Sequence, residues 1–87
     1  MKIKDGFILR KVGIQYVVAA TGKASEGFNG MMRLNETGAF AFRLLQEGIS
    51  EEALVRRVTE EYDVPPEAAQ RDLQAFLKKL KEAEALV

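Results

Sequence analysis

The sequence predicts an α+β domain of winged-helix-like architecture, with a three-stranded antiparallel sheet followed by three helices. Before residue 35, runs of β-branched and aromatic residues are interrupted by glycines, which is typical of short strands. After residue 38, apolar residues recur at i, i+3 and i+4, which is typical of helices packed on a core. Asn35 lies between the two patterns and is suited to cap a helix. With 87 residues, we expect a single domain over residues 1–87.

The first two strands are expected to form a hairpin. Phe7–Val12 and Ile14–Thr21 are rich in residues that favour strands, and Gly13 lies in or next to the turn between them. Residues 22–27 are polar and bracketed by glycines, which predicts a connector.

The third strand is expected over Phe28–Leu34. Side chains alternate along a strand, so Met32 and Leu34 should share one face, and Met31 and Arg33 the other. In a simple meander this strand is an edge, and an edge exposes backbone N–H and C=O groups unless it is covered or used.

Three helices are expected over residues 36–46, 51–62 and from 66 onward. Gly48 should end the first, Ser50 should cap the second, and Pro66 should open the third, which we expect to fray near Leu86. The predicted buried faces are Ala39, Phe40, Phe42, Leu44 and Leu45; Leu54, Val55, Val58 and Tyr62; and Ala69, Leu73, Phe76, Leu77 and Leu80.

Composition argues against several functional classes. Thirteen basic and thirteen acidic residues cancel, whereas nucleic-acid binding usually relies on an excess of Lys and Arg. The chain lacks His and Cys, which are the commonest general base, zinc ligands and thiol nucleophile. We therefore expect a binding protein rather than an enzyme, without cofactor or metal. No apolar run approaches a membrane span and the start lacks a signal peptide, so we expect a cytoplasmic protein.

Several segments resemble the PqqD-like family. Members include the peptide chaperone of pyrroloquinoline quinone (PQQ) biosynthesis and the precursor-peptide recognition elements of ribosomally made, modified peptides. The similarity covers essentially the whole chain and is strongest over residues 32–80. The matching segments are Leu34-Asn35-Glu36-Thr37-Gly38-Ala39, Leu44-Leu45-Gln46-Glu47-Gly48, Glu52-Ala53-Leu54, Tyr62, Val64 and Asp72-Leu73-Gln74-Ala75-Phe76-Leu77-Lys78-Lys79-Leu80. The ending Ala85-Leu86-Val87 departs from the Gly-Leu/Ile-Val ending usual in the family.

The resemblance implies a cytosolic adaptor that binds no DNA. Such domains hold the leader segment of a precursor peptide and present its core to a modifying enzyme, often a radical S-adenosylmethionine enzyme. The leader pairs with the third strand and lies in a groove beside the third helix. Of the two flanks of that helix, the resemblance favours Asp72, Ala75 and Lys79 over Gln70, Gln74 and Lys81, because the family carries an acid at the position of Asp72.

The candidate peptide-binding residues lie on the third strand and the third helix: Phe28, Asn29, Gly30, Met31, Met32, Arg33, Leu34, Asp72, Ala75, Phe76 and Lys79. A free edge can accept an extended peptide as an added strand. Met31 is expected at the binding edge and Met32 in the core. Arg33 is either a solubilising charge or a partner for an acid of the leader, and Gly30 marks either a bulge or a close approach of a peptide backbone.

Two alternative functions are also compatible with the sequence. A winged-helix module could bind nucleic acid through its third helix, and its affinity would fall with salt. A dimerisation module could pair the same strand edge with a second copy of itself. The oligomeric state is accordingly monomer or weak homodimer.

Overall fold

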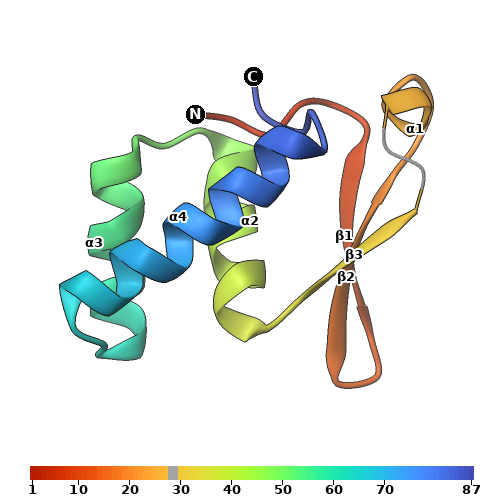
Figure 1. Cartoon of the computed structure of the whole chain (residues 1–87). Coiled ribbons are helices and arrows are strands. Elements are labelled where there is room, and N and C mark those ends of the chain that lie inside the picture. Colours follow the sequence, from red (N-terminus) through yellow and green to blue (C-terminus); the bar gives the residue numbers. More distant parts are fainter. Residues whose placement is uncertain (28–29) are drawn as a thin grey trace.

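The computed structural model describes residues 1–27 and 30–87, and it confirms the predicted α+β fold (Figure 1). A three-stranded antiparallel sheet of order β1-β2-β3 is followed by three helices that lie together on one side of it. The elements are β1 Phe7–Val12, β2 Gln15–Ala20, α1 Ala24–Gly27, β3 Met31–Leu34, α2 Glu36–Glu47, α3 Glu51–Tyr62 and α4 Pro66–Glu82.

The hairpin forms as predicted, with β2 one residue shorter at each end than expected. Gly13 has a φ of +64°, which a glycine adopts without steric cost. Gly13 forms a two-residue turn with Ile14, so β2 begins at Gln15 and not at Ile14 as expected. β2 is the central strand of the sheet, and its Val18 pairs with Leu9 on one side and Met32 on the other.

The connector and the third strand differ from the prediction. The connector contains one helical turn, α1, whose Ser25 hydroxyl donates to the Gly22 carbonyl at 2.6 Å. The third strand was expected from Phe28, but β3 begins at Met31. Gly30 lies at a bend before it with a φ of +151°, so it is neither a strand residue nor a bulge within the strand. Phe28 and Asn29 lie outside the described residues.

The helix boundaries follow from their caps. Asn35 Oδ1 accepts from the Gly38 N–H at 2.7 Å, and Ser50 Oγ accepts from the Ala53 N–H at 3.2 Å. These bonds satisfy donors that the first turn of a helix leaves unpaired. Gly48, with a φ of +96°, donates its N–H to the carbonyls of Leu44 and Leu45 and ends α2. Pro66 opens α4, where the missing N–H costs nothing.

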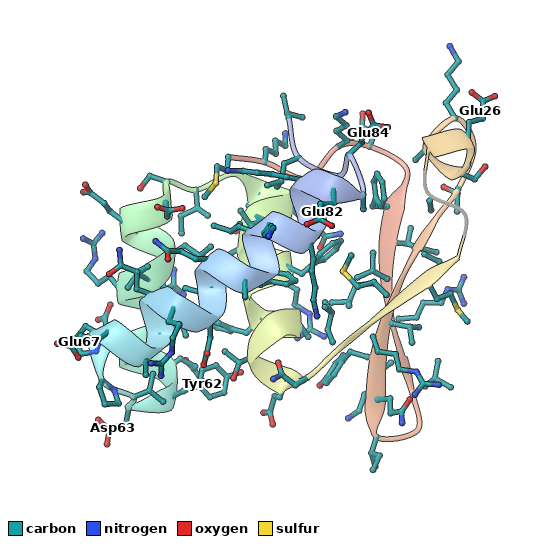
Figure 2. The ribbon with its side chains drawn as sticks, viewed as in Figure 1. Glu26, Tyr62, Asp63, Glu67, Glu82 and Glu84 are labelled. Carbon is teal, nitrogen blue, oxygen red and sulfur yellow. The ribbon has the colours of Figure 1, made fainter. Side chains whose placement is uncertain are left out.

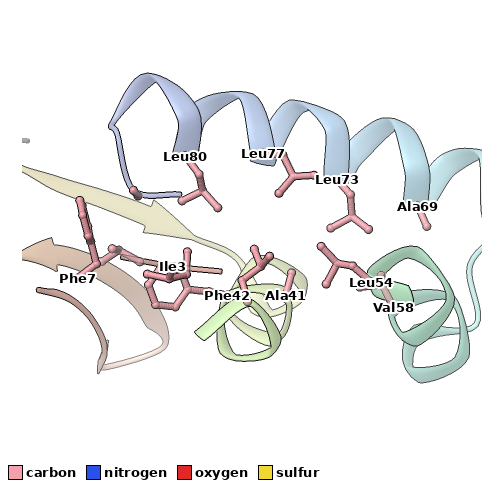
Figure 3. Packing of buried hydrophobic residues seen from close by; sticks show 13 residues of the cluster. Ile3, Phe7, Ala41, Phe42, Leu54, Val58, Ala69, Leu73, Leu77 and Leu80 are labelled. Atoms are coloured by element: carbon pink, nitrogen blue, oxygen red, sulfur yellow. The ribbon is translucent and has the colours of Figure 1, made fainter. Parts of the chain in front are cut away.

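One hydrophobic core joins the sheet to the helices (Figure 3). The predicted α4 stripe is confirmed, with Leu73, Leu77 and Leu80 each at most 3% exposed, while Phe76 is half-buried at its margin. Met32 is half-buried against the core rather than inside it. The buried members are Ile3, Phe7, Val18, Ala41, Phe42, Leu45, Leu54, Val58, Ala69, Leu73, Leu77, Leu80 and Ala85.

The predicted fraying of the last segment is wrong. α4 ends at Glu82, and Glu84 (φ +56°) turns the chain so that Leu86 forms an antiparallel bridge with Ile3. The Lys4 N–H donates to the Ala85 carbonyl at 2.7 Å. Ile3 and Ala85 are buried, and the burial of their apolar surface stabilises a pairing between residues far apart in sequence.

Candidate functional site

A groove of about 400 Å³ lies between β3 and α4, with α3 beneath it. Its β3 side comes from Arg33 and Leu34 and continues into the first turn of α2, which follows without a linker. Because Asn35 caps α2 directly after β3, the strand and the helix meet at a fixed junction. The lining residues are Arg33, Leu34, Asn35, Thr37, Gly38, Val58, Tyr62, Val64, Ala69, Asp72, Leu73, Ala75, Phe76 and Lys79.

The apolar floor of the groove is built around Tyr62. Figure 2 shows Tyr62 at the end of α3, and its hydroxyl donates to the Glu36 carbonyl at 3.4 Å. Its ring packs edge-on against Phe40 with centroids 5.5 Å apart. Burial, assisted by the nearby Glu36 carboxylate, raises the pKa of the Tyr62 hydroxyl, a group that is neutral at physiological pH even without this shift. The floor therefore offers an apolar surface to a ligand.

The α4 wall is one flank of that helix. Asp72, Ala75, Phe76 and Lys79 stand three and four residues apart, a spacing that places side chains on one side of a helix. Asp72, Ala75 and Lys79 are exposed at the rim, and Phe76 is half-buried below them. Gln70, Gln74 and Lys81, on the opposite flank, are not among the lining residues.

The outer edge of β3 presents backbone groups beside this groove. The two-residue turn makes Val12 and Gln15 a hydrogen-bonded pair, and bonding groups alternate sides along a strand. The backbone groups of Tyr16 and Val18 therefore face β3.

The partners of these residues in β3 are Leu34 and Met32. The backbone groups of Leu34 and Met32 therefore face β2, and the N–H and C=O groups of Met31 and Arg33 point away from β2. Among the described residues, β2 is the only strand that pairs with β3. This edge can therefore accept a further strand.

The structure brings together six of the eleven predicted site residues around one groove. They are Arg33, Leu34, Asp72, Ala75, Phe76 and Lys79. Met31 is 70% exposed at the edge and Met32 is half-buried beneath the sheet, so neither lines the groove. Gly30 is exposed before β3, and Phe28 and Asn29 lie outside the described residues.

Sequence reasoning missed part of the groove. Tyr62 was predicted only as a buried face residue and Asn35 only as a cap, yet both line the groove, as does Val64. A cap at the strand–helix junction is a local signal that could have indicated Asn35. Tyr62 and Val64 reach the groove only because α3 packs beside α4, which no local pattern reveals.

Metal-ligand clusters, unpaired buried polar atoms and membrane-spanning helices are the features of three other kinds of site. Over residues 1–27 and 30–87, no group of three or more His, Cys, Asp or Glu residues is placed to hold a metal ion. In the same residues, every buried side-chain nitrogen or oxygen has a hydrogen-bond partner. No helix among them has the length and apolar character that crossing a membrane requires.

The fold and the groove define a winged-helix-like α+β domain with an open sheet edge walled by a helix. The chain belongs to the PqqD family, since the model of coenzyme PQQ synthesis protein D matches residues 15–86. This confirms the resemblance predicted from the sequence. No curated protein matches the chain.

Two solved structures are similar along almost the whole chain. One is TbiB1 in complex with the TbiA(beta) leader peptide, which is 28% identical with a TM-score of 0.76 over 99% of this chain and 94% of that chain. The other is lasso peptide synthetase B1 complexed with the leader peptide, which is 25% identical with a TM-score of 0.71 over 93% of this chain and 89% of that chain. Both relatives carry leader peptides.

Proposed function

We propose that this domain binds the leader segment of a ribosomally made precursor peptide as a fourth strand along β3. The observation that carries the proposal is the pair of outward-facing backbone positions, Met31 and Arg33, beside an apolar groove walled by α4. An added strand would place alternate side chains in the groove. The leader complexes of the two similar structures support the same interpretation.

The energetics require the groove as well as the edge. A micromolar complex needs about −8 kcal/mol. Backbone hydrogen bonds contribute about 0.5–1.5 kcal/mol each, and the four residues of β3 offer few of them. Ordering a flexible peptide opposes this gain. Burial of apolar side chains, at about 1.5–3 kcal/mol each, must supply the rest, and Phe76 and Tyr62 provide the surface for it.

In this proposal the domain is an adaptor and not an enzyme. The rim carries Asp72 and Lys79, but the chain has neither His nor Cys to act with them. The domain holds the leader while a separate enzyme, such as a radical S-adenosylmethionine enzyme, modifies the remainder of the precursor. It acts in the cytoplasm, where ribosomally made precursors are released, and residues 1–87 act as one unit.

Amide hydrogen exchange tests the binding mode directly. The ligand is a synthetic leader from the short precursor gene expected next to the gene for this chain, and calorimetry first establishes its affinity. Binding should slow exchange at the amides of Met31 and Arg33, because each gains a hydrogen bond to the peptide. The amides of Leu9 and Lys11, which face outward from β1 by the same alternation, serve as the internal control.

The outcomes separate the three candidate functions. Protection confined to Met31 and Arg33 supports strand addition at β3. Leader binding without such protection would overturn strand addition. Protection that grows with protein concentration in the absence of leader would instead indicate self-pairing of β3. Duplex DNA binding at low salt would favour the nucleic-acid function.

A further inference from the structure

The face of the sheet that points away from the helices forms a second surface, which shares only Arg33 with the groove lining. Side chains alternate across the sheet, so its residues follow from the strand registers. Ile8, Ala19 and Met31 form one row across the three strands, and Arg10, Val17 and Arg33 form the next. We call these six residues the outer sheet face. Helices α2, α3 and α4 all lie on the other side (Figure 1).

This side of the molecule concentrates exposed apolar surface. In the part of the chain that the structure describes, four large hydrophobic residues are exposed, and three of them belong to the sheet and its turn. These are Val12 at 61%, Ile14 at 94% and Met31 at 70% exposed. Val12 and Ile14 lie at the turn and Met31 lies near the opposite end of the sheet, so apolar side chains are exposed at both ends of this surface.

The charge of this surface indicates the kind of partner. The whole chain has equal numbers of acidic and basic residues, but the three strands contain Arg10, Lys11 and Arg33 and no acid. Arg10 and Arg33 flank Val17 in one row of the outer sheet face. Stacking two copies face to face would bring like charges together, which disfavours self-association here. An acidic protein surface with an apolar centre is complementary to it.

We propose that the outer sheet face docks the modifying enzyme through an acidic, apolar-centred patch of that enzyme. The inference rests on the proposed function, in which a leader strand adds to β3. That strand would extend the same sheet, so its own outward side chains would continue this surface. The enzyme would thus contact adaptor and leader together, while the groove on the opposite side remains filled by the leader.

Charge reversal on β1 tests the proposal without touching the leader site. Arg10 is exposed and lies two strands away from the β3 edge. The probe is the purified modifying enzyme encoded next to the gene for this chain, titrated against the leader-loaded adaptor. Arg10→Glu should weaken enzyme binding by about tenfold or more while leaving leader affinity unchanged. The matched control is Arg56→Glu, the same change at an exposed position of α3 outside the groove lining, which should alter neither.

A second variant tests the apolar part of the surface. Ile14→Ser, at the tip of the hairpin, should also weaken enzyme binding and spare leader binding, which shows at once that the variants are folded. Raising the salt concentration should weaken enzyme binding to the wild type more than to Arg10→Glu, because salt screens exposed charges.

Three results would overturn the proposal. The first is enzyme affinity unchanged in both Arg10→Glu and Ile14→Ser. The second is equal loss in Arg56→Glu, which would indicate a non-specific charge effect. The third is binding of the wild type to phosphatidylglycerol vesicles that Arg10→Glu abolishes while enzyme binding persists, which would make the surface a lipid contact. Each leaves leader binding intact, whereas failure of the wild type to bind any leader would refute the proposed function itself.

Discussion

The two edges of the sheet expose the same kind of backbone group but differ in what stands beside them. By the hydrogen-bond alternation, Leu9 and Lys11 face outward from β1, as Met31 and Arg33 do from β3. The β3 edge lies beside the groove walled by α4 and floored by α3, and no residue of β1 lines that groove. The β1 edge carries the exposed charges of Arg10 and Lys11, and charged residues are a common way to discourage pairing at an edge. An open edge alone therefore does not make a site.

The largest expected effect is on the free energy of unfolding, when the packing of α4, the wall of the groove beside β3, is weakened. Leu73 is 3% exposed and seats α4 on the core. Leu73→Ala should lower the free energy of unfolding by about 2–5 kcal/mol, since it deletes buried surface and leaves a cavity. Urea denaturation measures this change. Gln74→Ala, at the exposed neighbouring position, should stay within about 0.5 kcal/mol. Similar effects of both variants would contradict the role given to Leu73.

The next effect concerns the groove as the source of affinity. Phe76→Ala removes the half-buried aromatic surface of the wall. Leader affinity should fall by about 1.5–3 kcal/mol, which is roughly 10–150-fold. Calorimetry measures it. Ile8→Ala removes a half-buried apolar side chain from β1 and should leave leader affinity unchanged. Equal losses of leader affinity in Phe76→Ala and Ile8→Ala would mean that the groove beside β3 contributes no more to leader binding than β1 does.

A matched pair of prolines compares the edges themselves. Met31→Pro removes an outward N–H at β3, and Lys11→Pro removes one at β1. Neither N–H belongs to the ladder with β2, so both variants should keep the sheet. Met31→Pro should weaken leader binding about tenfold, through one lost hydrogen bond and the bulk of the ring. Lys11→Pro should not. Unchanged affinity for Met31→Pro would exclude pairing at that position.

The smallest effect is expected from the charges at the rim. Lys79 is exposed beside the groove, and an exposed ion pair contributes at most about 1 kcal/mol, which is roughly fivefold in affinity. Lys79→Gln should therefore alter leader affinity by no more than this, and the difference should disappear in 1 M salt, at about 3 Å screening length. Lys81→Gln on the opposite flank of α4 should have no effect. A larger change that persists in salt would mean that Lys79 is desolvated by the leader.

The local signals in the sequence were sufficient for most of the fold. Capping residues such as Asn35, Ser50 and Gly48 act within one turn, so they placed the helix ends to within about a residue. The stripe on α4 and the extent of β1 follow from side-chain periodicity. The third strand was predicted too long because nothing local distinguishes Gly30 in a strand from Gly30 at a bend.

Contacts between distant segments could not be predicted in this way. The bridge of Ile3 with Leu86 depends on both chain ends meeting at the core. The contribution of Tyr62 to the groove depends on how α3 packs against α4. Only the family resemblance indicates which flank of α4 faces β3, because Asp72 and Gln74 border the apolar stripe on either side and periodicity does not distinguish them.

The burial of Val18 also bears on the register of the strands in the sheet. It is 2% exposed, at the centre of the middle strand, and is paired with both neighbours. A slip of one residue would turn every side chain of that strand over and would expose Val18 to water. A slip of one residue in β3 itself would exchange the amides that this strand presents outward for those that face β2. The burial of Val18 on β2, and of Met32 and Leu34 beside it on β3, therefore fixes which amides this domain offers to an added strand.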